Sequence, residues 1–318
     1  MTTETSAFVR PARLSLGDKA TAYFRLGKMR VYHHVYAWLL AVLLLAHEGI
    51  SRSGMAVALL LVLVGMFAMK IATCAADDVV GFRDGSDAKN YADGGHLPKS
   101  NKPLLSGRLS EREAIVFGIV TGLIALGSGV ALLLPLGGNV PLPFLAIWFA
   151  VVAIAVQYSW LYQFSYRPGG LEFVIFLVNV AEVLGPYWLI ARHWTADSIL
   201  IGPLVGVSML LVVSYANFGD RVGDLAAGRR TLAAVVPPSI YRALIAVLSV
   251  VSLALLVAPF FFGSLNPLLV ICVVPAIVLR VKQIRAGLVQ DQVQRAVVLG
   301  FRSTDALGLG LALALVLS

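Results

Sequence analysis

Residues 54–78 read GMAVALLLVLVGMFAMKIATCAADD, an apolar run that ends in two adjacent aspartates, Asp77 and Asp78. A helix of about 20 apolar residues crosses the hydrocarbon core of a bilayer, and this run reaches that length. Only helices and closed barrels satisfy their backbone hydrogen bonds in lipid, and the run lacks the alternation of a barrel strand. The stretch therefore predicts a membrane-spanning helix with carboxylates at its end.

The same apolar pattern recurs along the chain. Nine stretches qualify as spans, of which the eighth is the shortest: 33–50, 54–76, 113–135, 141–161, 170–191, 197–217, 240–262, 265–281 and 297–317. The composition agrees, because the chain is 59% hydrophobic and only 13% charged, whereas soluble domains are roughly half apolar and a quarter charged. The predicted fold class is an all-α polytopic membrane protein with about nine transmembrane helices.

The basic residues predict the orientation of these helices. All of the Lys and Arg residues except Arg52, Lys70 and Arg192 lie in, or in the turns flanking, segments 1–32, 77–112, 162–169, 218–239 and 282–296. Positive charge gathers on the cytoplasmic side of a membrane. We therefore expect the N-terminus in the cytoplasm and the C-terminus on the outer side. The membrane in question is the cytoplasmic membrane of the cell.

The chain divides into two predicted parts. Residues 1–30 are polar and basic and lack the apolar core of a cleavable signal peptide. They predict a cytoplasmic tail, with a short amphipathic helix near residues 14–26. Residues 31–318 form the predicted transmembrane domain.

The net charge of +8 does not indicate nucleic acid as a partner. The basic residues lie in loops between apolar runs, which suits contact with anionic lipids and binding of an anionic substrate. The chain has no basic stripe interleaved with aromatic residues of the kind that binds single strands. Cys74 and Cys272 form no CxxC pair, so neither a zinc site nor a disulfide framework is expected.

Two polar segments on the predicted cytoplasmic side carry clustered acids. The first, residues 74–87, reads CAADDVVGFRDGSD, and the second, residues 217–224, reads NFGDRVGD before GRRTLA at 228–233. On a helix Asn217, Asp220 and Asp224 share one face, because they are spaced at i, i+3 and i+7. By the same rule Thr73, Asp77, Asp84 and Lys70 share a face.

Clustered carboxylates of this kind are typical of a site for magnesium and diphosphate. Carboxylates alone repel a diphosphate, but Mg²⁺ bound to one or two of them attracts phosphate oxygens. Lysine and arginine would complete the clamp, and Mg²⁺ would neutralise the charge on a leaving diphosphate. The basic candidates are Lys70, Arg83, Lys102, Arg167, Arg229 and Arg230. Two such segments on one side make ordinary solvated loops the weaker interpretation.

Other polar residues allow two interpretations each. Glu172, Asn179 and Glu182 share a helix face and either line a cavity or make interhelical hydrogen bonds. Tyr158, Tyr162 and Tyr166, spaced at i, i+4 and i+8, form either an interfacial aromatic belt or a site where Tyr162 binds diphosphate and the rings stabilise a carbocation. His33 and His34 have no metal-ligand companions and are interpreted as structural.

These segments resemble the paired aspartate motifs of the UbiA superfamily of membrane prenyltransferases. Asp220, Asp224, Gly228, Arg229, Thr231 and Leu232 match that family's second motif in order, residues 101–107 (NKPLLSG) resemble the loop after its first motif, and Lys28 resembles the basic residue before its first span. Within the family, residues 77–87, 162–172 and 224–233 look most like the 1,4-dihydroxy-2-naphthoate polyprenyltransferases. The resemblance covers roughly residues 25–317.

The resemblance implies an enzyme with helices around a central cavity, an isoprenyl diphosphate as donor, a small aromatic acceptor and Mg²⁺ as cofactor. The implied catalytic residues are Asp77, Asp78, Asp220 and Asp224. The implied metal ligands are Asp77, Asp78, Asp84, Asp87, Asn217, Asp220 and Asp224, and the residues expected at the diphosphate are Lys70, Arg83, Lys102, Tyr162, Arg167 and Arg229.

The sequence also departs from the family pattern. Asp77 stands where the family has asparagine, Gly81 stands where it has a metal-binding aspartate, and the loop 89–102 is longer and carries Asp93. Asp84 or Asp87 is expected to replace the missing ligand.

Two other functions remain open at this point. A terpene cyclase of the same superfamily would use the same clamp without an acceptor, and the altered first motif is its signature. A transporter would carry charges deep in several spans and helices broken at mid-membrane, whereas most charge here lies at one surface.

Overall fold

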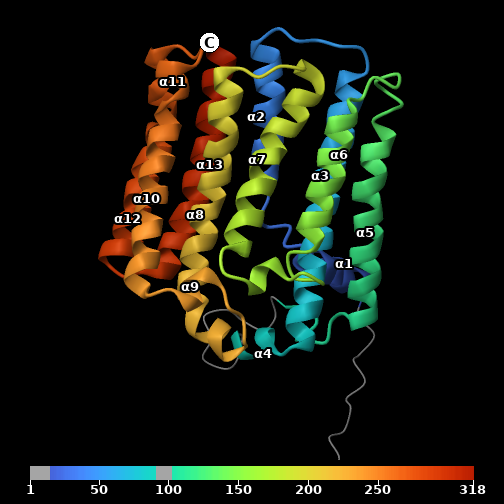
Figure 1. The fold of residues 1–318 in the computed structure, drawn as a ribbon, viewed down its shortest axis with the longest axis vertical. Helices are drawn as coiled ribbons and strands as arrows, with labels where there is room; N and C mark the ends of the chain where they lie inside the picture. The colour runs from blue at the N-terminus through green and yellow to red at the C-terminus, as the bar shows by residue number, and fades with distance from the viewer. Residues whose placement is uncertain (1–14, 91–101) are drawn as a thin grey trace, which may run out of the picture.

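The computed structural model describes residues 15–90 and 102–318 of the chain. Within these ranges all regular structure is helical, and the long helices lie side by side in one bundle (Figure 1). The predicted all-α fold is confirmed. The motif residue Asn101 and the inserted Asp93 lie outside the described residues.

The bundle is built from the long helices α2 (His34–His47), α3 (Met55–Arg83), α5 (Glu111–Ala131), α6 (Leu142–Val156), α7 (Gly170–Ala191), α8 (Ala196–Ala226), α10 (Pro238–Val257), α12 (Val274–Ile284) and α13 (Val293–Leu317). Shorter elements join them: α1 (Leu16–Leu26), α4 (Ser86–Asn90), α9 (Leu232–Val235), α11 (Pro259–Phe262), the 3₁₀ helices η2 (Phe164–Tyr166) and η3 (Pro267–Val273), and the π-helix η4 (Arg285–Val289).

Seven segments of the described chain are long and apolar enough to span a membrane. They are α3, α5, α7, α8, α10, the continuous stretch Pro267–Val289 and α13. The first and fourth predicted spans hold shorter helices, α2 with 14 residues and α6 with 15. Whether α2 and α6 also span the membrane, as the predicted count of nine requires, stays a prediction.

Both aspartate segments lie on helices that extend beyond the ends of their predicted spans. α3 continues to Arg83 over 29 residues and α8 continues to Ala226 over 31 residues. No proline interrupts either sequence between the apolar run and the aspartates, so the helical hydrogen bonding continues. The carboxylates of both segments thus lie at one end of the bundle, here called the aspartate end. α4 and α9 lie at this end and the C-terminus at the other (Figure 1).

Helix α1 confirms the short amphipathic helix expected near residues 14–26. The Ser15 side chain accepts a hydrogen bond from the Asp18 backbone N–H and caps the helix. Ala22 and Leu26 pack in one apolar cluster with residues of α3 and α5. Lys19 forms an ion pair of 2.7 Å with Glu113, so α1 is tied to the first turn of α5.

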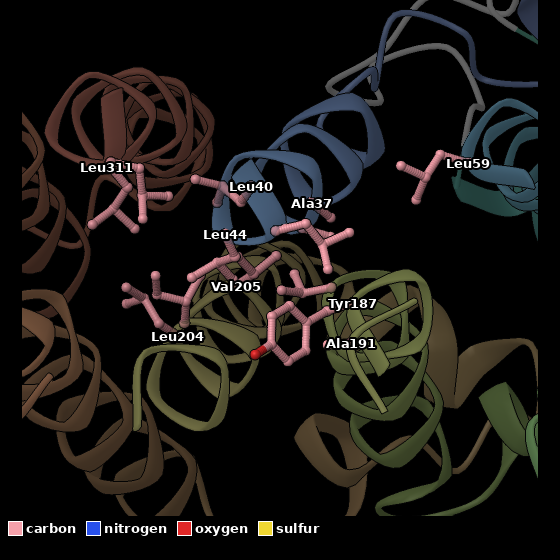
Figure 2. Close-up of a cluster of buried hydrophobic side chains, with 14 of the residues drawn as sticks. Ala37, Leu40, Leu44, Leu59, Tyr187, Ala191, Leu204, Val205 and Leu311 are labelled. Carbon is pink, nitrogen blue, oxygen red and sulfur yellow. The ribbon is translucent and has the colours of Figure 1, made fainter. Parts of the chain in front are cut away.

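Helix α8 lies at the centre of the bundle, where it packs against α2, α7, α10 and α13. Most of its apolar stretch is buried. Figure 2 shows the cluster that α8 forms with its neighbours, in which Leu204 and Val205 of α8 meet Leu40 and Leu44 of α2 and Tyr187 of α7. This packing fixes the direction in which α8 carries its aspartates.

Helix α6 ends at Val156, earlier than the predicted span 141–161. The chain then folds back on itself, because Ser165 N–H donates to the Tyr158 carbonyl at 2.7 Å. Tyr158, Tyr162 and Tyr166 therefore do not share a helix face, and the i, i+4, i+8 interpretation of their spacing is wrong. Leu161 and Gln163 adopt positive φ angles in this reversal, a conformation that a helix does not contain.

Candidate active site

Asp77 lies at the centre of a polar cluster at the aspartate end. Lys28 Nζ is 2.9 Å from one carboxylate oxygen, and Ser159 Oγ donates to the other at 2.7 Å. Arg229 approaches the same oxygen to 3.9 Å. Burial opposes the charge of Lys28, but Asp77, Cys74 and Asp78 together outweigh burial and hold the pKa of Lys28 well above its usual value. Three separate regions of the chain thus supply cations and a hydroxyl to one carboxylate.

Two further carboxylates, both buried, share the ammonium group of Lys102. Lys102 Nζ lies 2.7 Å from Asp78 and 3.0 Å from Asp87, and all three side chains are buried. Burial raises the pKa of the Asp87 carboxyl, and Lys102 offsets only part of this effect. Burial and Lys28 oppose the charge of Lys102, yet the surrounding carboxylates raise its pKa overall. Lys102 therefore links the end of α3 to α4.

Gly81 explains how Asp87 reaches this position. A Cβ atom added at Gly81 would lie 2.9 Å from Asp87 Cγ and 3.0 Å from both of its carboxylate oxygens. Asp87 therefore fills the space that a side chain at position 81 would take. Of the two residues expected to replace the missing aspartate, Asp87 is the one whose carboxylate lies there.

Asp84 ends α3 and is held by different groups. Its carboxylate accepts a hydrogen bond of 2.8 Å from the Ser86 backbone N–H and another from the Tyr166 hydroxyl. Arg229 stacks over the Tyr166 ring at 4.6 Å from the centroid. Burial and the bond to Asp84 raise the pKa of the Tyr166 phenol above its usual range. Asp84 is thus committed to the loop that precedes α7.

The second aspartate segment lies on the last three turns of α8. Asn217 and Asp224 are buried and Asp220 is exposed, although the three share the predicted helix face. Thr231 Oγ1 donates to the Asp224 carboxylate at 3.3 Å, and the Arg229 backbone N–H donates to the Asp224 carbonyl at 2.8 Å. These contacts turn the chain after α8 so that Arg229 points back toward Asp77.

A cavity of about 240 Å³ opens beside Asp77 between α2, α3, α7, α8 and α13. Its polar wall is formed by Lys28, His34, Lys70, Asp77 and Asn179 together with Thr73 and Tyr158. Its apolar wall includes Met69, Val174, Val178, Met209 and Val213. The wall of the cavity therefore combines charged and apolar side chains.

A buried histidine and glutamate meet at this cavity. His34 Nδ1 lies 2.5 and 2.6 Å from the two Glu182 carboxylate oxygens, and the ring also lines the cavity. The interhelical interpretation of Glu182 thus agrees with the geometry. Lys70 donates to the backbone carbonyls of Lys28 and Val31, with 3.1 Å to the first. It holds the segment before α2 against α3.

Some residues expected at the site lie apart from Asp77. Arg83 forms an ion pair with Glu111 at the end of α3. Arg167 stacks over the Tyr162 ring at 4.2 Å and donates to its carbonyl at 2.9 Å, and both side chains are exposed. In this arrangement neither Arg83 nor the Tyr162–Arg167 pair contacts the carboxylates of the Asp77 cluster.

The donor chemistry of this end fits a hard divalent cation. Its carboxylate and amide oxygens are the ligands that Mg²⁺ prefers, and Mg²⁺ needs only one or two carboxylates when water and phosphate oxygens supply the rest. The described residues contain no group of three metal-ligating side chains already gathered. Lys28 and Lys102 instead neutralise the carboxylates, so the site suits a cation that arrives together with an anionic ligand.

Ser159 and Ser165 belong to this cluster although their sequence context did not predict it. Ser159 bonds to Asp77 and lies 2.9 Å from Ser165, whose hydroxyl is also the partner of Arg229 at 3.4 Å. Neither serine has a motif signal in the sequence. Only the reversal of the chain after α6 brings them to the cluster.

Known proteins that are similar to this chain identify its family. The profile of the UbiA prenyltransferase family matches residues 35–304. A 4-hydroxybenzoate octaprenyltransferase of Alkalilimnicola ehrlichii is 27% identical over 257 residues, which is 76% of each chain. A second relative of that name, from Chromohalobacter salexigens, is 29% identical over 148 residues.

Solved structures show the same fold. A UbiA homologue of Archaeoglobus fulgidus bound to DMAPP and Mg²⁺ superimposes with a TM-score of 0.60 at 17% identity, covering 90% of this chain and 98% of the homologue. A digeranylgeranylglyceryl phosphate synthase superimposes with a TM-score of 0.62 at 13% identity, covering 95% of this chain and 100% of the synthase.

The curated relatives are named 4-hydroxybenzoate octaprenyltransferases, and neither carries the name of the naphthoate branch. The chain is therefore an integral membrane protein that belongs to the UbiA prenyltransferase family.

Proposed function

We propose that this protein transfers an isoprenyl group from an isoprenyl diphosphate to a hydroxylated aromatic carboxylic acid, in a reaction that depends on Mg²⁺. The cavity beside Asp77 carries this proposal. Lysine and aspartate side chains line part of this cavity, and methionine and valine side chains line the rest of its wall. A ligand with a charged head and an apolar tail matches both parts.

The diphosphate would bind at the mouth of the cavity. Lys28 and Arg229 flank Asp77, and Lys102 lies between Asp78 and Asp87. Asp77, Asp78 and Asp87 on one side, with Asn217, Asp220 and Asp224 on the other, would hold Mg²⁺. The bound cation would neutralise the charge of the leaving diphosphate. Lys28, Lys102 and Arg229 would attract the same oxygens and remain in place after the bond breaks.

The carbon chemistry would take place deeper in the cavity. The allylic C–O bond breaks with its electron pair on the diphosphate oxygen, and the Tyr158 ring in the cavity wall would stabilise the allylic cation. The acceptor ring then forms the new C–C bond and loses a proton. His34 is suited to accept this proton, because Glu182 contacts Nδ1 and thereby orients the ring toward the cavity.

Two acceptors are compared in the proposed assay. The relatives point to 4-hydroxybenzoate, and the motifs of this chain resemble enzymes that use 1,4-dihydroxy-2-naphthoate. Membranes that contain the protein would receive Mg²⁺, geranylgeranyl or octaprenyl diphosphate, and one acceptor or none. Mass analysis of the lipid extract then identifies the product.

The expected result is a prenylated aromatic that forms only when acceptor and Mg²⁺ are both present. Asp220→Ala and Asp224→Ala should each abolish its formation while the protein remains in the membrane. A cyclic hydrocarbon or alcohol formed without acceptor would show a terpene cyclase instead. Full activity in both alanine variants would contradict the site assignment.

A further inference from the structure

A second polar pocket, of about 450 Å³, lies between α12, η4 and α13 at the aspartate end. Lys282, Arg285, Arg295 and Arg302 line it, and all four side chains are exposed. Lys282 at the end of α12 and Arg285 at the start of η4 are spaced at i and i+3, and Arg295 and Arg302 of α13 at i and i+7, so each pair faces the pocket from one side. No acidic side chain lines the pocket within the described chain.

The four cations differ from other basic residues at this end. Arg83, Lys19 and Arg242 each pair with a carboxylate, at distances of 2.5 to 2.7 Å. Across residues 15–90 and 102–318, no carboxylate lies within ion-pair distance of the pocket's four cations. Within the described residues, Arg295 donates to the neutral Gln292 side chain at 3.0 Å. An anion from outside the protein is therefore the partner that would compensate their charge.

The surroundings of the pocket identify the source of that anion. Val281, Val289 and Val298 beside it are 52%, 75% and 51% exposed. Arg302 lies about 13 Å along α13 from its first residue, inside a candidate membrane span. These residues belong to candidate membrane spans, so we expect their exposed side chains to face lipid where the spans cross the bilayer.

The direction of Arg302 agrees with a ligand in the headgroup layer. Side chains on an α-helix tilt toward its N-terminus, and α13 begins at the aspartate end. Arg302 can thus extend out of the hydrocarbon toward Arg295 and Lys282, as basic side chains near helix ends do. The π-helix η4 widens the backbone at Arg285, and such turns occur often at functional sites.

We propose that Lys282, Arg285, Arg295 and Arg302 bind the headgroup phosphate of an anionic glycerophospholipid, with its acyl chains along the exposed valines. Basic pockets between membrane helices recognise headgroups in this way. The site is separate from the cavity beside Asp77 and does not depend on the proposed reaction.

The test measures lipid binding to the purified, delipidated full chain by native mass spectrometry in mixed micelles. Phosphatidylglycerol is titrated against phosphatidylcholine, with inorganic phosphate and glycerophosphoglycerol as soluble competitors. The variant Arg285→Gln, Arg295→Gln, Arg302→Gln is compared with a control that loses the same charge elsewhere, Arg30→Gln, Arg108→Gln, Arg112→Gln.

We expect the parent and the control to bind phosphatidylglycerol in preference to phosphatidylcholine, and the pocket variant to bind it about 100-fold more weakly. The single variant Arg302→Gln should bind about fivefold more weakly, which keeps the test informative if the triple variant does not fold. Equal binding by parent and pocket variants overturns the proposal, as does no preference over phosphatidylcholine. Displacement by inorganic phosphate would show a soluble anion site instead.

Discussion

Gly81 and Asp87 form a pair in which the absence of one side chain makes room for the other. A Cβ at position 81 would lie within 3.0 Å of the Asp87 carboxylate, so the two positions do not hold carboxylates independently. The family pattern that this sequence resembles implies an aspartate at the position of Gly81. We therefore infer that Asp87 supplies the carboxylate that Gly81 lacks.

A residue swap tests this relation. Asp87→Ala should reduce prenyl transfer strongly, because one oxygen ligand is lost from the cluster around Lys102. Gly81→Asp alone should also reduce it, because two carboxylates would crowd one space. The double variant Gly81→Asp, Asp87→Ala should recover much of the activity, measured as kcat with saturating substrates. A double variant no better than either single change would contradict the substitution of one carboxylate for the other.

His34 is the second residue whose role can be isolated. His34→Gln should lower kcat by about 100-fold or more, the usual contribution of a general base, with little change in the affinity for isoprenyl diphosphate. Asn179→Ala is the matched control, because Asn179 also lines the cavity but donates only to the Ile175 carbonyl of its own helix. Equal losses in both variants would assign His34 to packing.

At the scale of helices, α3, α5 and α6 meet at Gly65, whose lack of a side chain leaves room for their close approach. A Cβ at Gly65 would lie 2.2 Å from Ser128 Oγ of α5 and 2.4 Å from the Trp148 ring of α6. Gly127 on α5 has open space around it. Close approach of helices at small residues stabilises membrane proteins through packing, since lipid supplies no hydrophobic drive.

The glycine pair gives a matched stability test. Gly65→Ala should lower the melting temperature in detergent, because overpacking costs about 1–3 kcal/mol. Gly127→Ala should leave it unchanged or raise it, because alanine favours a helix more than glycine does. Thermal unfolding followed by circular dichroism measures both. A more stable Gly65→Ala variant would mean that α6 is free to move away from α3.

The same elements show what sequence can predict about this protein. The apolar run 54–76 and the i, i+3, i+7 spacing of Asn217, Asp220 and Asp224 placed both aspartate segments on helices, because those features are local. The contact of Ser159 with Asp77 joins residues 82 positions apart. It depends on where α6 stops and how the chain reverses, and neither follows from periodicity. Lengths of α2 and α6 were overestimated because apolar residues continue through their turns.

The whole molecule carries its basic residues mostly at the aspartate end. Arg52 and Arg192 are exceptions, near the start of α3 and the end of α7. The positive-inside rule therefore predicts that the aspartate end faces the cytoplasm.

In a background without Cys74 and Cys272, Arg230→Cys should react with an impermeant thiol reagent only in inside-out vesicles. Arg192→Cys should react only in right-side-out vesicles, and the reverse pattern would invert the topology.

The length of α3 and α8 has a consequence for the membrane in which this protein works. Asp77 lies about 33 Å from the first residue of α3, and Asp220 about 36 Å from that of α8. If each helix begins at the opposite face of a hydrocarbon core about 30 Å thick, the carboxylates clear the core by only a few ångströms. A thicker bilayer would draw them into the acyl chains or force the helices to tilt. Turnover in liposomes should therefore fall when oleoyl lipids are replaced by erucoyl lipids, and this dependence would confine the enzyme to membranes of matching thickness.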